Sequence, residues 1–273
     1  MNNHRIVIEP GAQDNFYWRD LWKFRELFFF LAWRDILVRY KQTFIGVSWS
    51  FIRPFFTIII FTLIGRLGHF PDEGAPYALL VGAAILPWQF FSNAFSEASN
   101  SLISNSGMLS KIYFPRLIIP ASTIIVCLID FLIAFVIVVL LMFWYHYVPS
   151  WQIVTLPLFL ILALITSMGA GILIAAINVK YRDFRYVIPF IVQFGLYVSP
   201  VMFSSSVVPG KWKMLYSLNP MVGVIEGFRW AILGDKTNIY LPGFSLSIIL
   251  SIAILIFGIK YFKKVEKNFA DII

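Results

Sequence analysis

The segment FFFLAWRDILVRYKQTFIGVSW, residues 28–49, is as apolar as a membrane span. Four charged side chains nevertheless fall within eight of its positions: Arg34, Asp35, Arg39 and Lys41. A charged side chain at the centre of a bilayer costs roughly 2.5–3.5 kcal/mol on insertion scales. The charged part of this segment is therefore not a span, and it needs a different place relative to the membrane.

Two apolar stripes separate these charges when residues 22–41 are wound as an α-helix at about 100° per residue. One stripe holds Trp22, Phe29, Trp33, Ile36, Leu37 and Tyr40, and the roughly opposite one holds Phe24, Leu27, Phe28, Leu31 and Val38. The pattern predicts an amphipathic interface helix over residues 21–42, lying along the inner membrane surface. One face would meet lipid or the spans and the other a second protein body; the alternative is a plain membrane-surface anchor.

The composition of the whole chain is that of an integral membrane protein. Of the 273 residues, 59% are hydrophobic and 13% are charged, against about 25% charged in soluble domains, and the mean hydropathy is +0.79. The net charge of +8 fits cationic loops on the cytoplasmic side, so nucleic acid is not an expected partner. The single cysteine, Cys127, lies in an apolar run, which excludes a disulfide framework.

Six apolar stretches are long enough to suggest spans, and they predict an all-α membrane domain over residues 43–273, after a cytoplasmic tail (1–20) and the interface helix. No signal peptide is expected in the first 20 residues. The excess of Lys and Arg in one set of loops predicts that both termini are cytoplasmic. The expected spans are 44–66, 77–99, 117–145, 152–177, 186–203 and 242–262.

The fourth expected span and the segment after the fifth carry more local signals. Ala163, Ser167, Gly171 and Ala175 form a small-residue face that lets another helix approach closely, in the same chain or in a second copy. Downstream, Asn219 and Pro220 are typical of a helix N-cap and first residue, and Gly234 of its end. We expect one or two short helices at the outer mouth, between spans five and six.

The sequence contains no recognisable catalytic or metal site. It has no phosphate-binding loop of the G-x-x-x-x-G-K-[ST] type, and His4, His69 and His146 are scattered. Charges within the spans (Arg53, Glu97 and Asp130) are too few for a proton relay. Arg53 is expected to reach the inner interface, and Asp130 to be neutral or paired with Arg53 or a backbone group.

Aromatic side chains gather on the segments most suited to face a conduit. Sugar rings stack on aromatic faces, so these residues are candidates for glycan contact, with an interfacial belt or lipid contact as the alternative. The candidates are Trp49, Phe51, Phe55, Trp88, Phe90, Phe91, Tyr197 and Phe203.

Four stretches resemble one family in the same order along the chain. They are FRELFFFLAWRDILVRYKQTFIGVSWSFIRP, NSGMLSKIYFPR, INVKYRDFRYVIPF and SLNPMVGVIEGFRWAILG, and they are similar to the permease subunits of type-2 ABC exporters. The nearest branch exports polysaccharide: O-antigen, capsule or teichoic acid. The resemblance covers nearly the whole chain from about residue 20.

The resemblance implies a homodimer in the bacterial inner membrane, bound to two ATPase subunits that hold ATP and Mg. A lipid-linked glycan would pass along an aromatic-lined channel, and this chain would need no cofactor of its own. Asn219, Pro220, Glu226 and Arg229 would belong to periplasmic gate helices. Coupling to the ATPase would involve Trp33, Arg34, Val38 and Arg39 on the interface helix and Asn105, Gly107, Met108, Leu109 and Lys111 in the inner loop.

Three other functions remain open on the sequence. A type-2 exporter of a small molecule or drug shares most of these features. A motor-free secondary transporter would need inverted repeats or clustered intramembrane charges. An enzyme acting on polyprenyl lipids would need acidic or histidine clusters at the interface, for which Asp72 and Glu73 alone are weak support.

Overall fold

A computed structural model describes residues 17–41, 46–109, 111–181, 183–267 and 269, and within them every regular element is a helix. The elements are α1 (Tyr17–Lys23), α2 (Arg25–Lys41), α3 (Gly46–Leu67), α4 (Tyr77–Ser104), α5 (Ser106–Leu109), α6 (Ile118–Trp144), η2 (Trp151–Thr155), α7 (Leu156–Lys180), α8 (Phe184–Val198), η3 (Ser205–Val207), α9 (Gly210–Tyr216), α10 (Pro220–Leu233), η4 (Gly234–Lys236) and α11 (Leu241–Glu266).

Five of these helices are long and apolar enough to cross a membrane: α3, α4, α6, α7 together with η2, and α11. The chain is thus a multi-pass helical membrane protein, as predicted. The segment expected as the span 186–203 forms α8, an apolar helix of 15 residues, which is about 22 Å long against a hydrocarbon core of about 30 Å. It ends where Ser199 turns extended ahead of Pro200, because the residue before a proline avoids the helical region.

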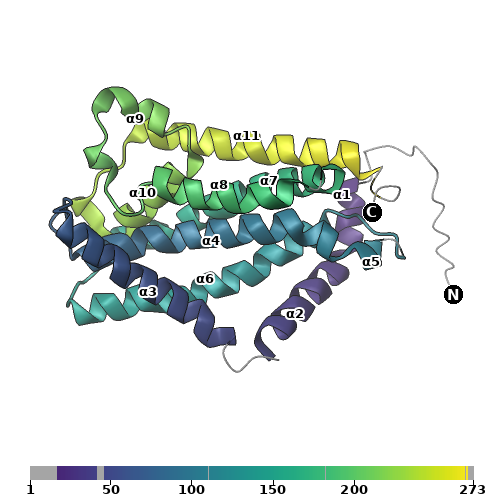
Figure 1. The fold of residues 1–273 in the computed structure, drawn as a ribbon, viewed down its shortest axis with the longest axis horizontal. Coiled ribbons are helices and arrows are strands. Elements are labelled where there is room, and N and C mark those ends of the chain that lie inside the picture. Colours follow the sequence, from purple (N-terminus) through teal and green to yellow (C-terminus); the bar gives the residue numbers. More distant parts are fainter. Residues whose placement is uncertain (1–16, 42–45, 110, 182, 268, 270–273) are drawn as a thin grey trace.

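The long helices run side by side with similar axes, and α2 crosses them obliquely at one end (Figure 1). The Tyr17 hydroxyl donates a 2.9 Å hydrogen bond to Glu266, so α1 and the last turn of α11 lie at the same end of the bundle. The helices α9 and α10 lie at the other end (Figure 1). With cytoplasmic termini, the end with α1, α5 and the last turn of α11 is the inner end; the orientation itself stays a prediction.

The centre of the bundle is α4, which packs against α3, α6, α7 and α10. The small-residue face of α7 meets it: a Cβ atom placed on Gly171 would lie 2.7 Å from the Cβ of Ala98. The partner of the small-residue face, which the sequence left open, is therefore α4 of the same chain. On another side of α7, a Cβ on Gly169 would lie 2.6 Å from the backbone nitrogen of Leu255 in α11, so α7 is closely packed on both neighbours.

The interface helix has two different faces, as its stripes predicted, and is interrupted after Lys23, between α1 and α2. Phe24, Leu27, Phe28 and the buried Leu31 pack into an apolar cluster at the inner end of the bundle. The opposite stripe is exposed at Trp22, Phe29 and Trp33, and its second half, Ile36, Leu37 and Tyr40, is half-buried. An exception is Val38, which was placed on the packed stripe but is also exposed.

Candidate functional site

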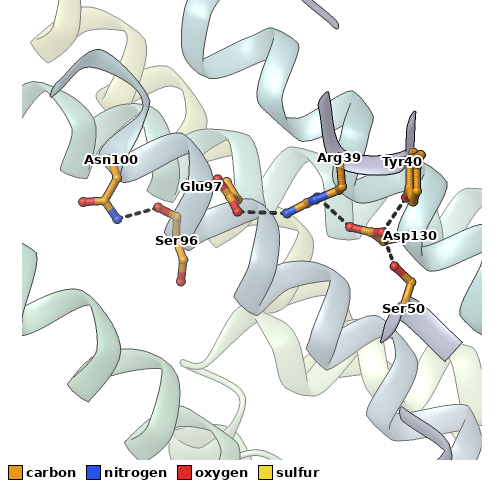
Figure 2. A network of polar contacts seen from close by, with 7 residues as sticks. All are labelled: Arg39, Tyr40, Ser50, Ser96, Glu97, Asn100 and Asp130. Atoms are coloured by element: carbon orange, nitrogen blue, oxygen red, sulfur yellow. Dashed lines mark hydrogen bonds and ion pairs between the residues drawn. The ribbon is translucent and has the colours of Figure 1, made fainter. Parts of the chain in front are cut away.

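A cluster of charged and hydroxyl side chains joins α2, α3, α4 and α6 (Figure 2). The guanidinium of Arg39 donates to Asp130 of α6 at 2.7 Å and to Glu97 of α4 at 3.0 Å. Asp130 also accepts hydrogen bonds from the hydroxyls of Tyr40 at 2.5 Å and Ser50 at 2.6 Å. The expectation that Asp130 pairs with Arg53 or a backbone group is wrong: its cation is Arg39, on the interface helix.

The depth of this cluster follows from its members on α2 and α3. Ser50 is four residues into α3, about 6 Å from the start of that span. Asp130 contacts Ser50 although it lies twelve residues into α6, or about 18 Å. The helix α6 therefore extends further toward the inner end than α3, and Asp130 lies level with the first turns of α3.

A cavity of about 480 Å³ opens beside the cluster, between α3, α4 and α6. Its wall combines apolar groups, including Trp49 and Phe90, with the polar side chains of Arg53, Gln89 and Asn93. Gln89, Asn93 and Glu97 follow one another at intervals of four residues, so one face of α4 supplies three of the polar groups. Trp49 and Phe90, two of the predicted channel aromatics, are thereby brought to the same wall.

The two segments predicted to couple to an ATPase meet through one hydrogen bond. Arg34 of α2 donates to the side-chain oxygen of Asn105, at the end of α4, at 3.1 Å, and also pairs with Asp35. Leu109 is buried and Met108 packs against the inner-end cluster. Trp33, Gly107 and Lys111 are exposed there, as is Val38. The structure thus gathers these residues at one end of the bundle, while their role stays a prediction.

The eight predicted channel aromatics fall into different environments. Trp88, Phe90 and Phe91 are buried between helices of the chain, and a Cβ on Gly195 of α8 would lie 2.6 Å from the Trp88 ring. Trp49, Phe55 and Tyr197 are exposed, and Phe51 and Phe203 are half-buried. Phe51 stacks on Phe55 with ring centroids 6.0 Å apart. The exposed candidates therefore come from α3 and α8.

Three aromatic side chains that sequence reasoning missed lie on α8, the helix that also carries Tyr197. Tyr186, Phe190 and Phe194 are exposed, and the last two rings stack with centroids 5.8 Å apart. Their spacing of four residues was a readable signal, because side chains at that interval share a helix face.

At the outer end, α10 has the termini that its sequence predicted. The Asn219 side chain accepts the backbone N–H of Met221 at 3.0 Å, Pro220 is the first helical residue, and Gly234 ends the helix with φ of 65°. Most of α10 is buried. It is enclosed by α4, α7, η2 and α11.

The two charged residues of α10, which were expected near the outer mouth, are buried inside the protein. Arg229 is 2% exposed and donates to the carbonyls of Leu80 at 3.3 Å, Phe203 at 2.9 Å and Val201 at 3.1 Å. Burial lowers the pKa of Arg229 to about 10, so it stays charged at neutral pH, and burial raises the pKa of Glu226. The contacts of Arg229 are those of a structural anchor; a gate role for Asn219, Pro220, Glu226 and Arg229 stays a prediction.

Five apolar spans and an amphipathic helix at one end define a multi-pass membrane protein. Residues 26–233, most of the chain, match the ABC-2 type transporter family. The chain belongs to the ABC-2 type transporter family, and the resemblance read from its sequence is confirmed.

Several curated proteins are similar to most of the chain. The O-antigen export system permease protein RfbA of Klebsiella pneumoniae is 26% identical over 250 residues, which cover 88% of this chain and 92% of that protein. RfbA of Myxococcus xanthus is 25% identical over 217 residues, or 77% and 82%. The polysialic acid transport protein KpsM of Escherichia coli is 26% identical over 210 residues, or 73% and 78%.

Proposed function

We propose that this chain is the membrane subunit of an ATP-driven exporter that moves a lipid-linked polysaccharide across the bacterial inner membrane. The observation that carries the proposal is the similarity, over most of both chains, to proteins named for export of O-antigen and transport of polysialic acid. ATP and Mg belong to a separate ATPase subunit in this proposal, and this chain has no cofactor of its own.

The exposed aromatic residues of α3 and α8 support a saccharide as cargo. Phe55, Phe194 and Tyr197 offer ring faces on the surface of the chain, and such faces attract the C–H groups of sugars. A second copy of the chain, facing these helices, would enclose them as a channel. The homodimer is thus part of the proposal.

The ATPase partner is expected at the exposed stripe of α2 and the nearby α5 segment. Trp33→Ala combined with Val38→Asp removes two exposed apolar groups and should abolish co-purification of the ATPase with this chain. Trp144→Ala, at the outer end of α6 and 78% exposed, is the matched control and should leave the complex intact. Equal recovery of the ATPase with both variants would contradict this docking surface.

The substrate is tested by depleting the chain in its source cell and extracting polyprenyl-linked glycans. Accumulation of a long lipid-linked polymer inside the cell, with loss of the surface polymer, is the expected result, and it also identifies the glycan. Unchanged glycan pools would exclude polysaccharide as cargo and favour a small-molecule exporter of the same family.

A further inference from the structure

The cavity between α3, α4 and α6 contains polar side chains that the fold itself does not use. Gln89 and Asn93 line it, and within the described ranges neither side-chain amide has a hydrogen-bond partner. Both lie next to buried residues on the most enclosed helix of the bundle. Both side chains are half-buried and line the cavity, so their amide groups are open to it and can donate hydrogen bonds to a ligand that displaces water.

The two arginines that line the cavity differ in their partners. Arg39 is held by Asp130 and Glu97. Arg53, which lines the same cavity, has no carboxylate within ion-pair distance among the residues that the structure places. Glu97 and Asp130 line the cavity too, but both are bound to Arg39. One cation and two amide donors are left for an incoming group, a set that suits an anion with several acceptor oxygens.

The position of the cavity restricts what can enter it. Arg53 is one helical turn beyond Ser50 on α3, close to the inner interface, where lipid headgroups lie. The remaining wall includes Leu86, Phe131 and Ala134, which are apolar and suit a hydrocarbon chain. Trp49, at the start of α3 and exposed, has the amphipathic ring that is common at this level of a membrane.

We propose that this cavity binds the phosphoryl headgroup of a lipid from the inner leaflet. Arg53 pairs with the phosphate, Gln89 and Asn93 donate hydrogen bonds to its oxygens, and the lipid chain lies against Phe131 and Leu86. The proposal goes beyond polysaccharide export, because the phosphate can belong to the polyprenyl carrier of a cargo or to a membrane phospholipid. The two sources share one chemistry and are separated by the test.

The test uses the full-length chain in phosphatidylcholine nanodiscs that contain a small fraction of photoreactive polyprenyl monophosphate. A parallel set contains photoreactive phosphatidylglycerol instead. After illumination, labelled peptides from α3, α4 and α6 are counted by mass spectrometry. Arg53→Gln should lower labelling about tenfold or more, since a charge-assisted hydrogen bond contributes about that factor to affinity.

Two further variants make the result interpretable. Arg66→Gln removes the same charge at the outer end of α3, where Arg66 is exposed, and should leave labelling unchanged. Gln89→Leu with Asn93→Leu keeps the side-chain size, and its loss of labelling supports the site independently of Arg53.

Each labelling result either supports the site and identifies its lipid or overturns the site. Variant-sensitive labelling by the polyprenyl probe alone assigns the site to a cargo carrier, and by the phospholipid probe alone to a membrane lipid. Equal labelling of the unmodified chain, Arg53→Gln and the double variant would overturn the site. Because binding is measured without export, this result is independent of whether the cargo is a polysaccharide.

Discussion

Two arginines hold the opposite ends of the bundle together in different ways. Arg229, at the outer end, is 2% exposed and bound to three backbone carbonyls. Arg39, at the inner end, has a side chain that is 33% exposed and bound to two carboxylates. Both connect helices that are far apart in sequence, but the atoms that accept their hydrogen bonds differ.

The difference indicates which end of the molecule can change shape. Backbone carbonyls near the start of α4 and in the turn after α8 cannot turn away without local refolding, so the Arg229 contacts are fixed. Carboxylates can leave a partner by a change of rotamer, on a timescale far shorter than that of helix motion. We therefore expect the Arg229 contacts at the outer end to persist and the Arg39 contacts at the inner end, where the ATPase is proposed to bind, to rearrange.

The largest expected effect is that of removing Arg229. Arg229→Ala leaves three carbonyls without their donor, at about 1–3 kcal/mol each, and opens a void among buried residues. We expect a loss of about 3 kcal/mol or more, seen as a fall of about 10 °C in apparent melting temperature or as failure to accumulate in the membrane. Arg229→Lys should recover little, because one ammonium group does not reproduce the forked geometry.

A matched exposed arginine separates charge from position. Arg66→Ala removes an exposed cation from the outer end of α3 and should change the melting temperature little. If Arg229→Ala were as stable as Arg66→Ala, the outer end would not be anchored as described.

Breaking the contact between Arg39 and Asp130 should have a smaller effect on stability and a larger one on transport. A double-mutant cycle with Arg39→Ala and Asp130→Ala is expected to give a coupling energy of about 1–2 kcal/mol, since the pair is partly exposed to water. ATP-driven export should fall about tenfold in either single variant. Additive stability losses with normal export would show that the contact is incidental.

Removing the Tyr40 hydroxyl tests one hydrogen bond of the same cluster. Tyr40→Phe deletes one donor to Asp130 and leaves Arg39 and Ser50 in place, so the expected destabilisation is about 0.5–1.5 kcal/mol. Tyr186→Phe, on the exposed side of α8, removes the same group without a described contact and serves as control. Equal melting temperatures for the two variants would contradict a structural role for this hydroxyl.

The smallest expected effect concerns the carboxyl of Glu226, one turn from Arg229. Burial raises its pKa above the usual value, so the folded protein holds the proton more tightly than the unfolded chain. The protonated carboxyl therefore contributes fully to stability below the pKa of an unfolded glutamate. This contribution is lost as the pH rises through the folded pKa. Glu226→Gln should raise the melting temperature at neutral pH by no more than about 2 °C.

The pH dependence distinguishes this cause from others. The advantage of Glu226→Gln should shrink as the pH is lowered toward and below the pKa of an unfolded glutamate. An advantage that is constant between neutral and acid pH would exclude titration of Glu226 as its source.

Local sequence signals predicted α10 and the interface helix well, because the interactions that define them lie within a few residues. Asn219, Pro220 and Gly234 satisfy the ends of their own helix, and the stripes of residues 22–41 share one helix by periodicity. The length of α8 could not be predicted from hydropathy, which does not register that Pro200 ends the helix at the residues before it.

The polar cluster could not be predicted from the sequence, for a different physical reason. Arg39 and Asp130 are 91 residues apart, and their contact depends on how far α6 extends past the start of α3. Position within a helix gives the level of a residue in the bundle only when neighbouring helices begin at the same level, and α3 and α6 do not. The burial of Arg229 could not be predicted from the sequence either, because its three carbonyl partners lie in two distant segments.

The length of α4 has a consequence for how this chain can vary. The helix is unbroken from Tyr77 to Ser104; the carbonyl of Leu80 meets Arg229 near one end, and Glu97 and Asn105 meet Arg39 and Arg34 near the other. Deleting one residue between these contacts would turn one end by about 100° and shorten the helix by about 1.5 Å. Insertions and deletions should therefore be tolerated in connections such as residues 68–76, while the distance in residues from Leu80 to Glu97 stays constant among functional variants.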